Sequence, residues 1–345
     1  VQLRRLREYA RVPLIAKPNA GMPQIVDGKA VYSCPPEEFT ALVPELLQAG
    51  VAIFGGCCGT DPEYIAGLAG YRDSLEDVPE RAAKETGRAE QGSRGLRICS
   101  STDVVHVDHV TVIGERINPT GKKRLKQALL EEDFDYILTQ AVEQIDAGAE
   151  ILDVNVGVPS LDDVSMLPRV IKKLQSITGM PLQIDSSNPA AIEAALRVYN
   201  GKAIVNSVNG EPEVMDNIFP IVKKYGAAVV GLTLDENGIP KTAEERFAIA
   251  ERILDRALSL GIPKRDIYID CLTLTASAEQ DGVMETLKAV LMVTERLGLK
   301  TVLGVSNISF GLPNRELINS TFLTMAMECG LTLPIMNTNI ASMIG

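Results

Sequence analysis

Three short segments decide the fold: EILDVNV (150–156), PLQIDS (181–186) and KAIVNSV (202–208). Each is a nearly continuous apolar run that ends in polar residues, which is typical of a parallel strand buried on both faces. Amphipathic segments of helical length lie between them, for example LTQAVEQIDAGA (138–149). This part of the chain therefore predicts repeated units of one strand and one helix.

The same unit repeats on both sides of these segments. Further strands are expected at TVIGE (111–115), AAVVGLT (227–233), DIYIDCL (266–272), TVLGVSN (301–307) and LPIMNT (333–338). Eight units fit a (β/α)8 TIM barrel, which usually has about 250 residues. An open doubly wound sheet is the alternative, but no G-x-G-x-x-G turn follows the first strand. We expect a barrel over residues 105–345 whose closing helix is missing.

The first 75 residues have a different pattern. A strand is expected at 13–19, a helix at 36–50, a strand at 51–56 and a helix at 61–75. Two such units are too few to close a core. Residues 1–75 are therefore expected to be the C-terminal part of a second, truncated (β/α)8 barrel. Residues 76–104 are charged and contain Gly and Ser, as in a linker.

Composition restricts the class of protein. The chain has 345 residues, 46% hydrophobic and 23% charged, with a net charge of −11. A nucleic-acid binder usually has a basic surplus, which this chain lacks. No apolar run is long enough to span a membrane. Six cysteines are too few for a disulfide scaffold. The composition favours a cytoplasmic protein with reduced thiols.

The candidate site follows from the barrel, because barrel enzymes carry their sites at the carboxyl ends of the strands. These ends are rich in carboxylates and carboxamides and poor in His, which argues against metal-dependent hydrolysis. A carboxylate accepts two parallel hydrogen bonds from an amidine-like edge, such as that of a pterin or purine. The alternative is that each residue caps the next helix. The candidates are Glu115, Asn118, Asp153, Asp185, Asn206, Asp270, Asn307 and Arg315.

A second candidate site is the segment GGCCGT (55–60). Cys57 and Cys58 follow two glycines at the end of an expected strand, so their thiolates could approach a metal closely. Zinc suits thiolate ligands and lowers the pKa of a coordinated thiol. Two cysteines do not complete a zinc site, so a third ligand has to come from elsewhere. The alternative is a pair of small buried residues on a glycine turn.

Several motifs together resemble one enzyme family. These are GERINPTG (114–121), DVNVG (153–157), IDSSNP (184–189), NSVNGE (206–211) and GVSNISFGLPNRELINSTFL (304–323). They are similar to the pterin-binding domain of cobalamin-dependent methionine synthase. KPNAGMP (17–23) and FGGCCGTDPEYI (54–65) are similar to the end of the homocysteine-binding barrel of that family. The order of the two modules also matches.

The resemblance implies an activity and roles for individual residues. The family passes a methyl group from 5-methyltetrahydrofolate to cob(I)alamin and then to homocysteine. Asn307 would support N5 of the pterin during transfer. Cys57 and Cys58 would be two of three zinc ligands, with the third upstream of residue 1. A cobalamin-binding domain of the same or another chain would be the partner. The pterin ligands by matching position would be Asp153, Asp185, Asn206, Asp270 and Asn307, with Glu115, Asn118 and Arg315 nearby.

Three other functions remain open from the sequence. A methyltetrahydrofolate:corrinoid protein methyltransferase shares the barrel, but it needs no thiol-activating zinc, so GGCC argues against it. Dihydropteroate synthase has the same fold and recognises the same edge of the pterin, but its last strands end in basic residues and histidine. Here these strands read VLGVSNISF and PIMNT. The third is a folate-binding module whose partner domains perform the chemistry.

Overall fold

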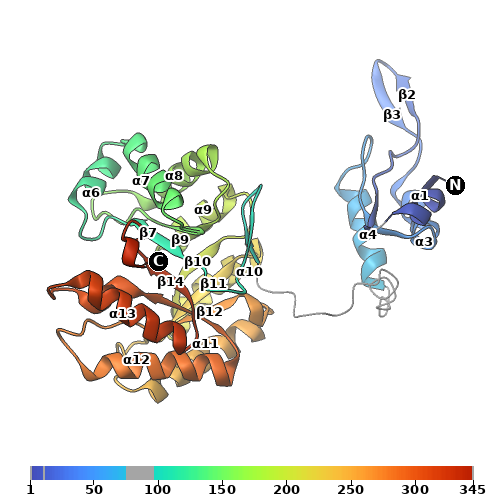
Figure 1. Ribbon diagram of the computed structural model, residues 1–345. Coiled ribbons are helices and arrows are strands. Elements are labelled where there is room, and N and C mark those ends of the chain that lie inside the picture. Colours follow the sequence, from blue (N-terminus) through green and yellow to red (C-terminus); the bar gives the residue numbers. More distant parts are fainter. Residues whose placement is uncertain (1, 11, 75–96, 344–345) are drawn as a thin grey trace. The chain divides into compact units, whose positions relative to one another are not determined.

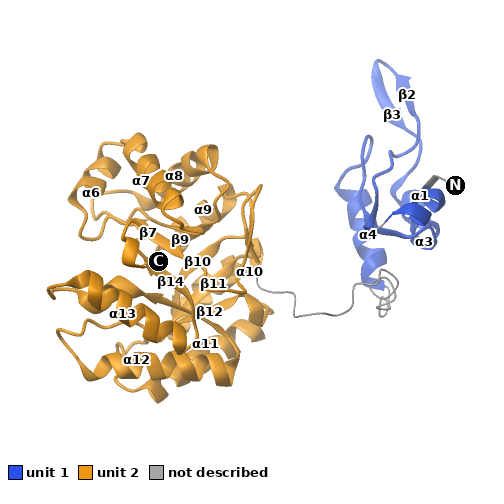
Figure 2. Ribbon diagram, in the orientation of Figure 1, with its two compact units in different colours: residues 1–93 blue, residues 94–345 orange. Residues whose placement is uncertain are grey.

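The computed structural model describes residues 2–10, 12–74 and 97–343, and the chain divides into two compact units, residues 1–93 and 94–345 (Figure 2). Both units contain helices and strands (Figure 1). None of the described helices has the length and apolar character needed to cross a membrane.

The first unit is a small α/β structure. Its elements are α1 (Gln2–Tyr9), β1 (Leu14–Ala16), β2 (Pro23–Val26), β3 (Lys29–Tyr32), α2 (Pro36–Ala41), α3 (Val43–Gln48), β4 (Val51–Phe54) and α4 (Pro62–Ser74). Strands β1 and β4 pair in parallel. Ala20, Phe39 and Tyr64 form the buried core, in which the two rings meet edge to face at 5.3 Å. That this unit ends a second barrel stays a prediction.

Two details of the first unit differ from expectation. The helix expected at 36–50 is divided into α2 and α3 at Leu42, because Pro44 lies in the first turn of α3 and cannot continue a preceding helix. Strands β2 and β3 form an antiparallel hairpin that the sequence pattern did not predict. Its turn is Asp27-Gly28, and both residues have positive φ, as a tight two-residue hairpin turn requires.

The second unit contains the predicted barrel. Eight parallel strands close in sequence order, with the last strand pairing with the first. The strands are β7 (Ile113–Ile117), β8 (Ile151–Asn155), β9 (Leu182–Asp185), β10 (Ile204–Asn209), β11 (Ala228–Leu232), β12 (Ile267–Asp270), β13 (Lys300–Gly304) and β14 (Leu331–Met336). The (β/α)8 fold is therefore confirmed.

Helices surround the barrel (Figure 1). They are α6 (Lys123–Leu130), α7 (Phe134–Asp146), α8 (Asp163–Ile177), α9 (Pro189–Val198), α10 (Pro212–Tyr225), α11 (Ala243–Ser259), α12 (Asp281–Met292) and α13 (Arg315–Glu328). Short helical turns η1 (Lys264–Asp266), η2 (Val293–Leu297), η3 (Val305–Ser309) and η4 (Ala341–Met343) complete the unit. The main hydrophobic core lies between these helices and the strands.

A second core fills the barrel interior. A hairpin of β5 (Arg97–Cys99) and β6 (Val104–His106) contributes the buried residue Ile98 to it, and Val107 follows directly after β6. Cys99 and Lys202 exchange backbone hydrogen bonds of 3.1 and 2.9 Å, which fixes the hairpin beside the start of β10. The hairpin therefore closes the amino end of the barrel and leaves the carboxyl end for the site.

The hairpin also changes the interpretation of the expected linker at 76–104. Its residues 97–99 and 104 belong to strands β5 and β6 of the second unit. The buried side chain of Ile98 packs into the barrel, so this segment is part of the barrel unit rather than a connection between two domains. Residues 75–96, which include most of the expected linker, lie outside the described residues.

The helices are capped by residues other than the candidates. Asp162 caps α8, Asn188 caps α9, and Thr242 forms a capping box with Glu245 at the start of α11. None of the eight candidates at the strand ends is the N-cap of a helix among the described residues. The capping alternative therefore does not account for them.

Candidate active site

Asp153 is the centre of a buried polar cluster at the carboxyl end of β8. Its side chain is 3% exposed, and its Oδ1 accepts a hydrogen bond of 2.8 Å from Gln183 Nε2 on β9. Burial raises the pKa of Asp153 well above its usual range, and the nearby Asp185 carboxylate raises it further. Hydrogen bonds from Gln183 and Asn206 oppose this shift.

Asp185 completes the cluster at the end of β9. In the strand register it lies opposite Asn155 of β8 and Asn206 of β10. Its Oδ2 accepts a hydrogen bond of 3.3 Å from Asn118 Nδ2. Burial raises the pKa of Asp185 to about 6, against the effect of hydrogen bonds with Asn155 and Asp153. The ionisation of each of these two carboxyls therefore affects that of the other.

Asp270 is a third buried carboxylate at the end of β12. It is 9% exposed, and its Oδ1 accepts a hydrogen bond of 2.7 Å from the backbone N–H of Leu272. Burial raises its pKa to about 7, although this hydrogen bond and the charge of Arg246 favour the ionised form. Within the part of the chain that the structure describes, no donor pairs with Oδ2 of Asp270. This oxygen is available to a ligand.

Glu115 anchors the other side of the site. It follows Gly114 in β7, and its Oε1 accepts a hydrogen bond of 3.1 Å from Ser306 Oγ in η3. Lys122 Nζ donates to the Glu115 carbonyl at 2.8 Å. Burial raises the pKa of Glu115 and lowers that of Lys122, while the opposite charges oppose both shifts. A cation and a carboxylate therefore stabilise each other at this rim.

The turn η3 presents Asn307. The Asn307 side chain is exposed, and α13 begins only at Arg315. Arg315 donates from Nη2 to the Ser306 carbonyl at 3.0 Å and from Nε to Ser309 Oγ at 3.0 Å. Its guanidinium also lies over the Phe310 ring, 5.6 Å from the centroid. Arg315 therefore holds the turn that carries Asn307.

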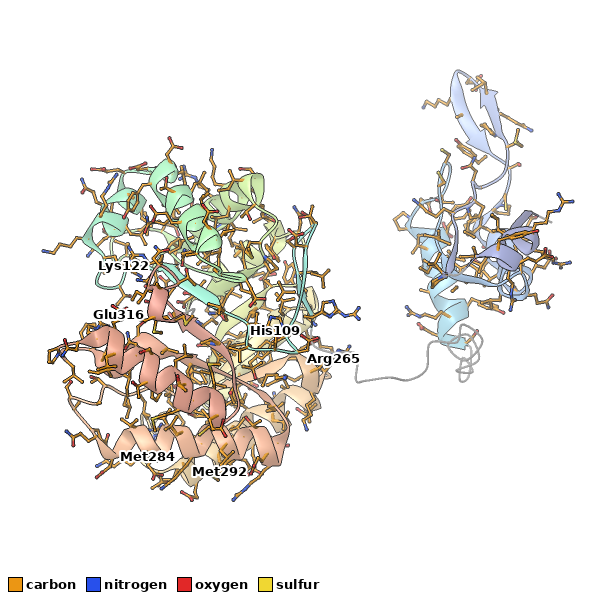
Figure 3. All side chains as sticks on the ribbon, in the orientation of Figure 1. His109, Lys122, Arg265, Met284, Met292 and Glu316 are labelled. Atoms are coloured by element: carbon orange, nitrogen blue, oxygen red, sulfur yellow. The ribbon has the colours of Figure 1, made fainter. Side chains whose placement is uncertain are left out.

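The structure adds residues that the sequence analysis did not select. Gln183 donates to the Asp153 carboxylate, Lys122 donates to the backbone carbonyl of Glu115, and Ser306 donates to the Glu115 carboxylate. Gln183 could have been found as a polar residue inside an otherwise apolar strand. Lys122 and His109 flank β7 in the sequence, on its carboxyl and amino sides (Figure 3). His109 contacts Glu150 at 2.9 Å, just before β8 and away from the candidates.

The cysteine pair lies just beyond β4 in the first unit. The Sγ atoms of Cys57 and Cys58 are 3.9 Å apart, both side chains are exposed and both thiols are free. Two thiolates on one tetrahedral zinc, each about 2.3 Å from the metal, are about 3.8 Å apart. The geometry therefore fits two zinc ligands. Among the described residues, no group of three or more His, Cys, Asp or Glu could hold a metal ion.

The backbone around the pair is tightly fixed. Cys57 N–H donates to the Pro18 carbonyl at 3.0 Å, and Cys58 N–H donates to Asn19 Oδ1 at 3.2 Å. A Cβ at Gly59, whose φ is +81°, would lie 2.2 Å from the Tyr32 ring. Only glycine fits this position, because the ring and the backbone approach each other so closely.

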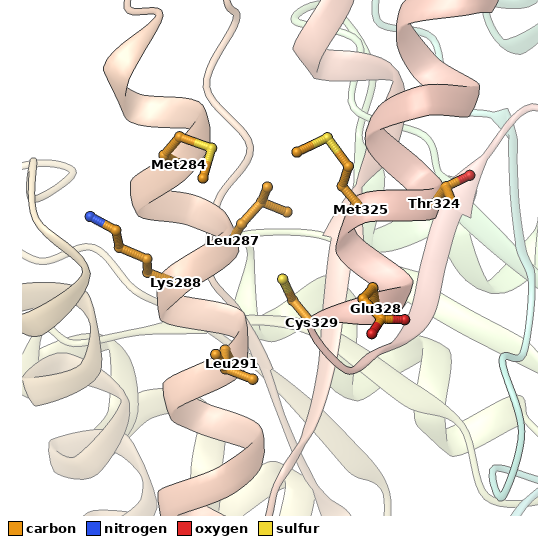
Figure 4. A pocket seen from close by; sticks show the side chains of 8 residues that line it. All are labelled: Met284, Leu287, Lys288, Leu291, Thr324, Met325, Glu328 and Cys329. Atoms are coloured by element: carbon orange, nitrogen blue, oxygen red, sulfur yellow. The ribbon is translucent and has the colours of Figure 1, made fainter.

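Two surface cavities lie elsewhere. One, of about 490 Å³, is an apolar groove between α12 and α13 lined by Met284, Leu287, Met325 and Cys329, among others (Figure 4). The other, of about 410 Å³, is lined by residues that include His109 and Thr332. None of the candidate residues lines either cavity.

Comparisons with known proteins agree with this division. A family model described as pterin binding enzyme matches residues 114–337, and one described as homocysteine S-methyltransferase matches residues 2–71. The chain is 34% identical over 354 residues to "Methionine synthase" from Mycobacterium leprae and 34% identical over 352 residues to that from Mycobacterium tuberculosis. Both alignments cover 98% of this chain but only 29% of the relatives.

Solved structures with the same fold include dihydropteroate synthases. The enzyme from Xanthomonas albilineans with 4-aminobenzoic acid has a TM-score of 0.59 at 19% identity, covering 72% of this chain and 95% of that chain. The enzyme from Thermus thermophilus has a TM-score of 0.54 at 21% identity, covering 71% and 95%. At these identities the likeness shows the fold alone. The family model spans most of the chain, and on that ground the chain belongs to the family of pterin-binding enzymes.

Proposed function

We propose that the chain takes part in methyl transfer from 5-methyltetrahydrofolate to a cobalamin and on to homocysteine, as the methionine synthases to which it is similar would imply. The observation that carries this proposal is the buried cluster of Asp153, Gln183 and Asp185 at the mouth of a pterin-binding barrel. In this proposal the second unit binds the folate, and the first unit contributes Cys57 and Cys58 to a zinc site.

The acidic cluster suits the amide and amidine edge of a pterin. In this proposal Asp153 and Asp185 share one proton, which leaves one carboxyl able to donate and the other ionised and able to accept. Asn206 adds a carboxamide, which donates and accepts at once. Asn118 holds Asp185 in place. Asp270 accepts a further hydrogen bond through its free Oδ2, so folate binding requires this carboxyl in its ionised form.

Asn307 acts where the chemistry occurs. During transfer the bond from N5 to the methyl carbon breaks, and N5 keeps the electron pair and takes up a proton. A carboxamide hydrogen-bonded to N5 interacts more strongly as this proton arrives, which lowers the barrier. Glu115 and Arg315 hold the turn of Asn307 through Ser306. Glu115 and Arg315 therefore affect the reaction indirectly, by positioning Asn307.

The proposal also involves a zinc ion and a cobalamin. A zinc ion held by Cys57, Cys58 and a third ligand would lower the pKa of the homocysteine thiol. A cobalamin held by a partner domain supplies the nucleophile that accepts the methyl group. This chain contributes binding, orientation and polar support.

The match to the homocysteine S-methyltransferase model favours this proposal over the corrinoid protein methyltransferase. That match covers residues 2–71, the part that contains Cys57 and Cys58. The dihydropteroate synthase alternative rests on a likeness of fold at low identity. The methionine synthase relatives match both units of the chain in one alignment.

The test combines binding and turnover. Calorimetry of the 345-residue chain with 5-methyltetrahydrofolate should show binding, and free cob(I)alamin should be methylated by the complex. Asp153→Ala should weaken folate binding about 10- to 100-fold, as expected for one charge-assisted hydrogen bond. Asp216→Ala is the control, because Asp216 pairs with Arg256 on the helical surface. Unchanged affinity in Asp153→Ala would remove this carboxyl from the pterin site.

A further inference from the structure

Arg246 is a completely buried cation directly behind the end of β12. It belongs to α11 and is 0% exposed. Its Nη1 lies within hydrogen-bond distance of the carbonyls of Cys271 and Leu272, at 2.9 and 3.2 Å, and of Thr286 Oγ1 at 2.8 Å. Its Nε donates to the Pro240 carbonyl at 2.9 Å. The guanidinium thus fastens the segment that follows Asp270.

The fastened segment has an unusual backbone. Leu272 has a φ of +62°, a left-handed backbone conformation that residues other than glycine rarely adopt. In this conformation its N–H donates to Asp270 Oδ1 at 2.7 Å, while its carbonyl accepts from Thr286 Oγ1 at 3.1 Å and from Arg246. The left-handed residue and the orientation of the Asp270 carboxyl therefore depend on the same set of contacts.

Arg246 has no carboxylate partner in an ion pair among the described residues, although burying a charge is costly without compensation. The charged and titratable groups that act on it are Glu279 and Glu285, Asp270, and the buried Cys271, whose thiol stays protonated because burial raises its pKa. Glu285 is already engaged with Lys288 at 2.7 Å and with Ala243 N–H at 2.8 Å. Of the carboxylates in this group, Glu279 and Asp270 have no ion-pair partner among the described residues, and Asp270 is the one at the end of a barrel strand.

We propose that Arg246 is a positioning residue of the folate site, which holds the turn after β12 and supplies the positive charge that keeps Asp270 ready to accept a hydrogen bond. This inference rests on the proposed role of Asp270 in folate binding. Arg246 itself does not reach the barrel mouth, because its guanidinium is buried and is bound to backbone carbonyls. It acts through Leu272 and Asp270.

A merely structural arginine would affect stability, whereas this role also predicts a change in pH dependence. Removing a positive charge from the vicinity of a carboxyl makes ionisation harder. In Arg246→Met, the midpoint pH at which 5-methyltetrahydrofolate binding is lost should rise by about 0.5–1 unit. This shift is smaller than that expected for a charge in direct contact with the carboxyl, because Arg246 does not contact the Asp270 side chain directly. Arg246→Lys keeps the charge and should keep this midpoint, but it should bind less tightly, since an ammonium cannot replace the planar contacts.

A second variant separates geometry from charge and remains informative if Arg246→Met does not fold. Thr286→Val removes the hydroxyl that joins Leu272 to Arg246 but leaves the charge in place. It should weaken binding about three- to ten-fold, as expected for one lost hydrogen bond, with an unchanged midpoint. Arg256→Met is the matched control on α11, because Arg256 pairs with Asp216 at the surface. It should change neither quantity.

Binding is measured by calorimetry of the 345-residue chain between about pH 5 and 9, and Asp270→Asn provides the reference. If Asp270→Asn binds with wild-type affinity and still loses binding at low pH as the wild type does, the role assigned to Asp270 is wrong, and the inference about Arg246 is wrong as well. Asp270→Asn is expected to abolish the loss of binding at low pH. If it does so while Arg246→Met behaves as wild type, the proposed function stands and the positioning role of Arg246 is overturned. The same conclusion follows if the two single variants Arg246→Lys and Thr286→Val both behave as wild type.

Discussion

The Ser306 hydroxyl donates to Glu115 Oε1 across 3.1 Å and joins two residues that are 191 positions apart in the chain. Glu115 is in β7, and Ser306 is in the turn after β13, next to Asn307. Strand β14 lies between them in the barrel. The bond therefore ties the turn of the proposed catalytic carboxamide to a strand that is not its neighbour.

Ser306→Ala should slow methyl transfer more than it weakens folate binding. The substitution leaves the turn attached through Arg315 but removes its link to Glu115. One hydrogen bond corresponds to about a ten-fold effect on rate. Single-turnover kinetics with cob(I)alamin check this. Ser320→Ala is the control, because its hydroxyl bonds only within α13. A wild-type rate for Ser306→Ala would show that the bond does not position Asn307.

Asn307→Ala should lower the rate about 10²-fold while the affinity for 5-methyltetrahydrofolate stays within about ten-fold. A contact that strengthens as N5 gains its proton lowers the barrier more than it stabilises the bound substrate. Stopped-flow transfer and calorimetry measure the two quantities separately. A rate loss that is fully explained by unfolding would contradict the catalytic role.

Gly304→Ala tests the same carboxamide without removing it. A Cβ at Gly304 would lie 2.9 Å from Asn307 Nδ2, so the side chain has to move. The backbone φ of −72° is accessible to alanine, and no strain arises from it. The rate should fall while the fold persists. Gly282→Ala is the control, because its Cβ would have no contact closer than 3.4 Å.

Gln183→Leu should weaken folate binding about ten-fold by removing the donor to Asp153. The loss of this bond also raises the pKa of Asp153, because the hydrogen bond favours the ionised form. Calorimetry at two pH values checks both effects. In Gln175→Leu, a control outside the site, the lost contacts are with Val198 and Asn200. Equal changes in both variants would assign the effect to general destabilisation.

Asp270→Asn should stabilise the free protein at pH 8 but not at pH 4. The pKa of Asp270 is raised to about 7 in the folded protein, because burial favours the protonated form. The contribution of this carboxyl to stability is therefore fully present below the pKa of the unfolded state and is lost as the pH rises toward 7. An amide carries no charge to bury, and its oxygen can still accept from Leu272. The free energy of unfolding at pH 8 should increase on the order of 2 kcal/mol. Urea titrations at both pH values measure it, and a pH-independent difference would contradict the assignment.

Zinc should bind weakly to this chain. Cys57 and Cys58 supply two thiolates, whereas stable sites have three or four protein ligands. Metal analysis after exposure to a chelator should find no stoichiometric zinc. Cys57→Ser should lower the weak uptake further, and Cys329→Ser, a thiol of the barrel unit, serves as the control. Chelator-resistant zinc would show that the ligand set is more complete than proposed.

The sequence by itself determined the barrel and most of the polar rim. Parallel strands buried on both faces need apolar residues at nearly every position, so strands such as β8 and β9 are visible without any tertiary information. Their carboxyl ends meet at one end of the barrel, which is why Asp153, Asp185 and Asn206 could be grouped in advance. The roles assigned to these residues remain predictions.

Only the tertiary structure decided which groups touch. Gln183 meets Asp153 because two strands pair in one register, and Ser306 meets Glu115 because the barrel closes. Arg246 is buried because α11 packs against β12 and α12, although an arginine on a helix usually faces water. These contacts are set by packing between segments far apart in the chain. Local periodicity reports which face of an element is apolar, and it carries no information about which distant side chain will lie against it.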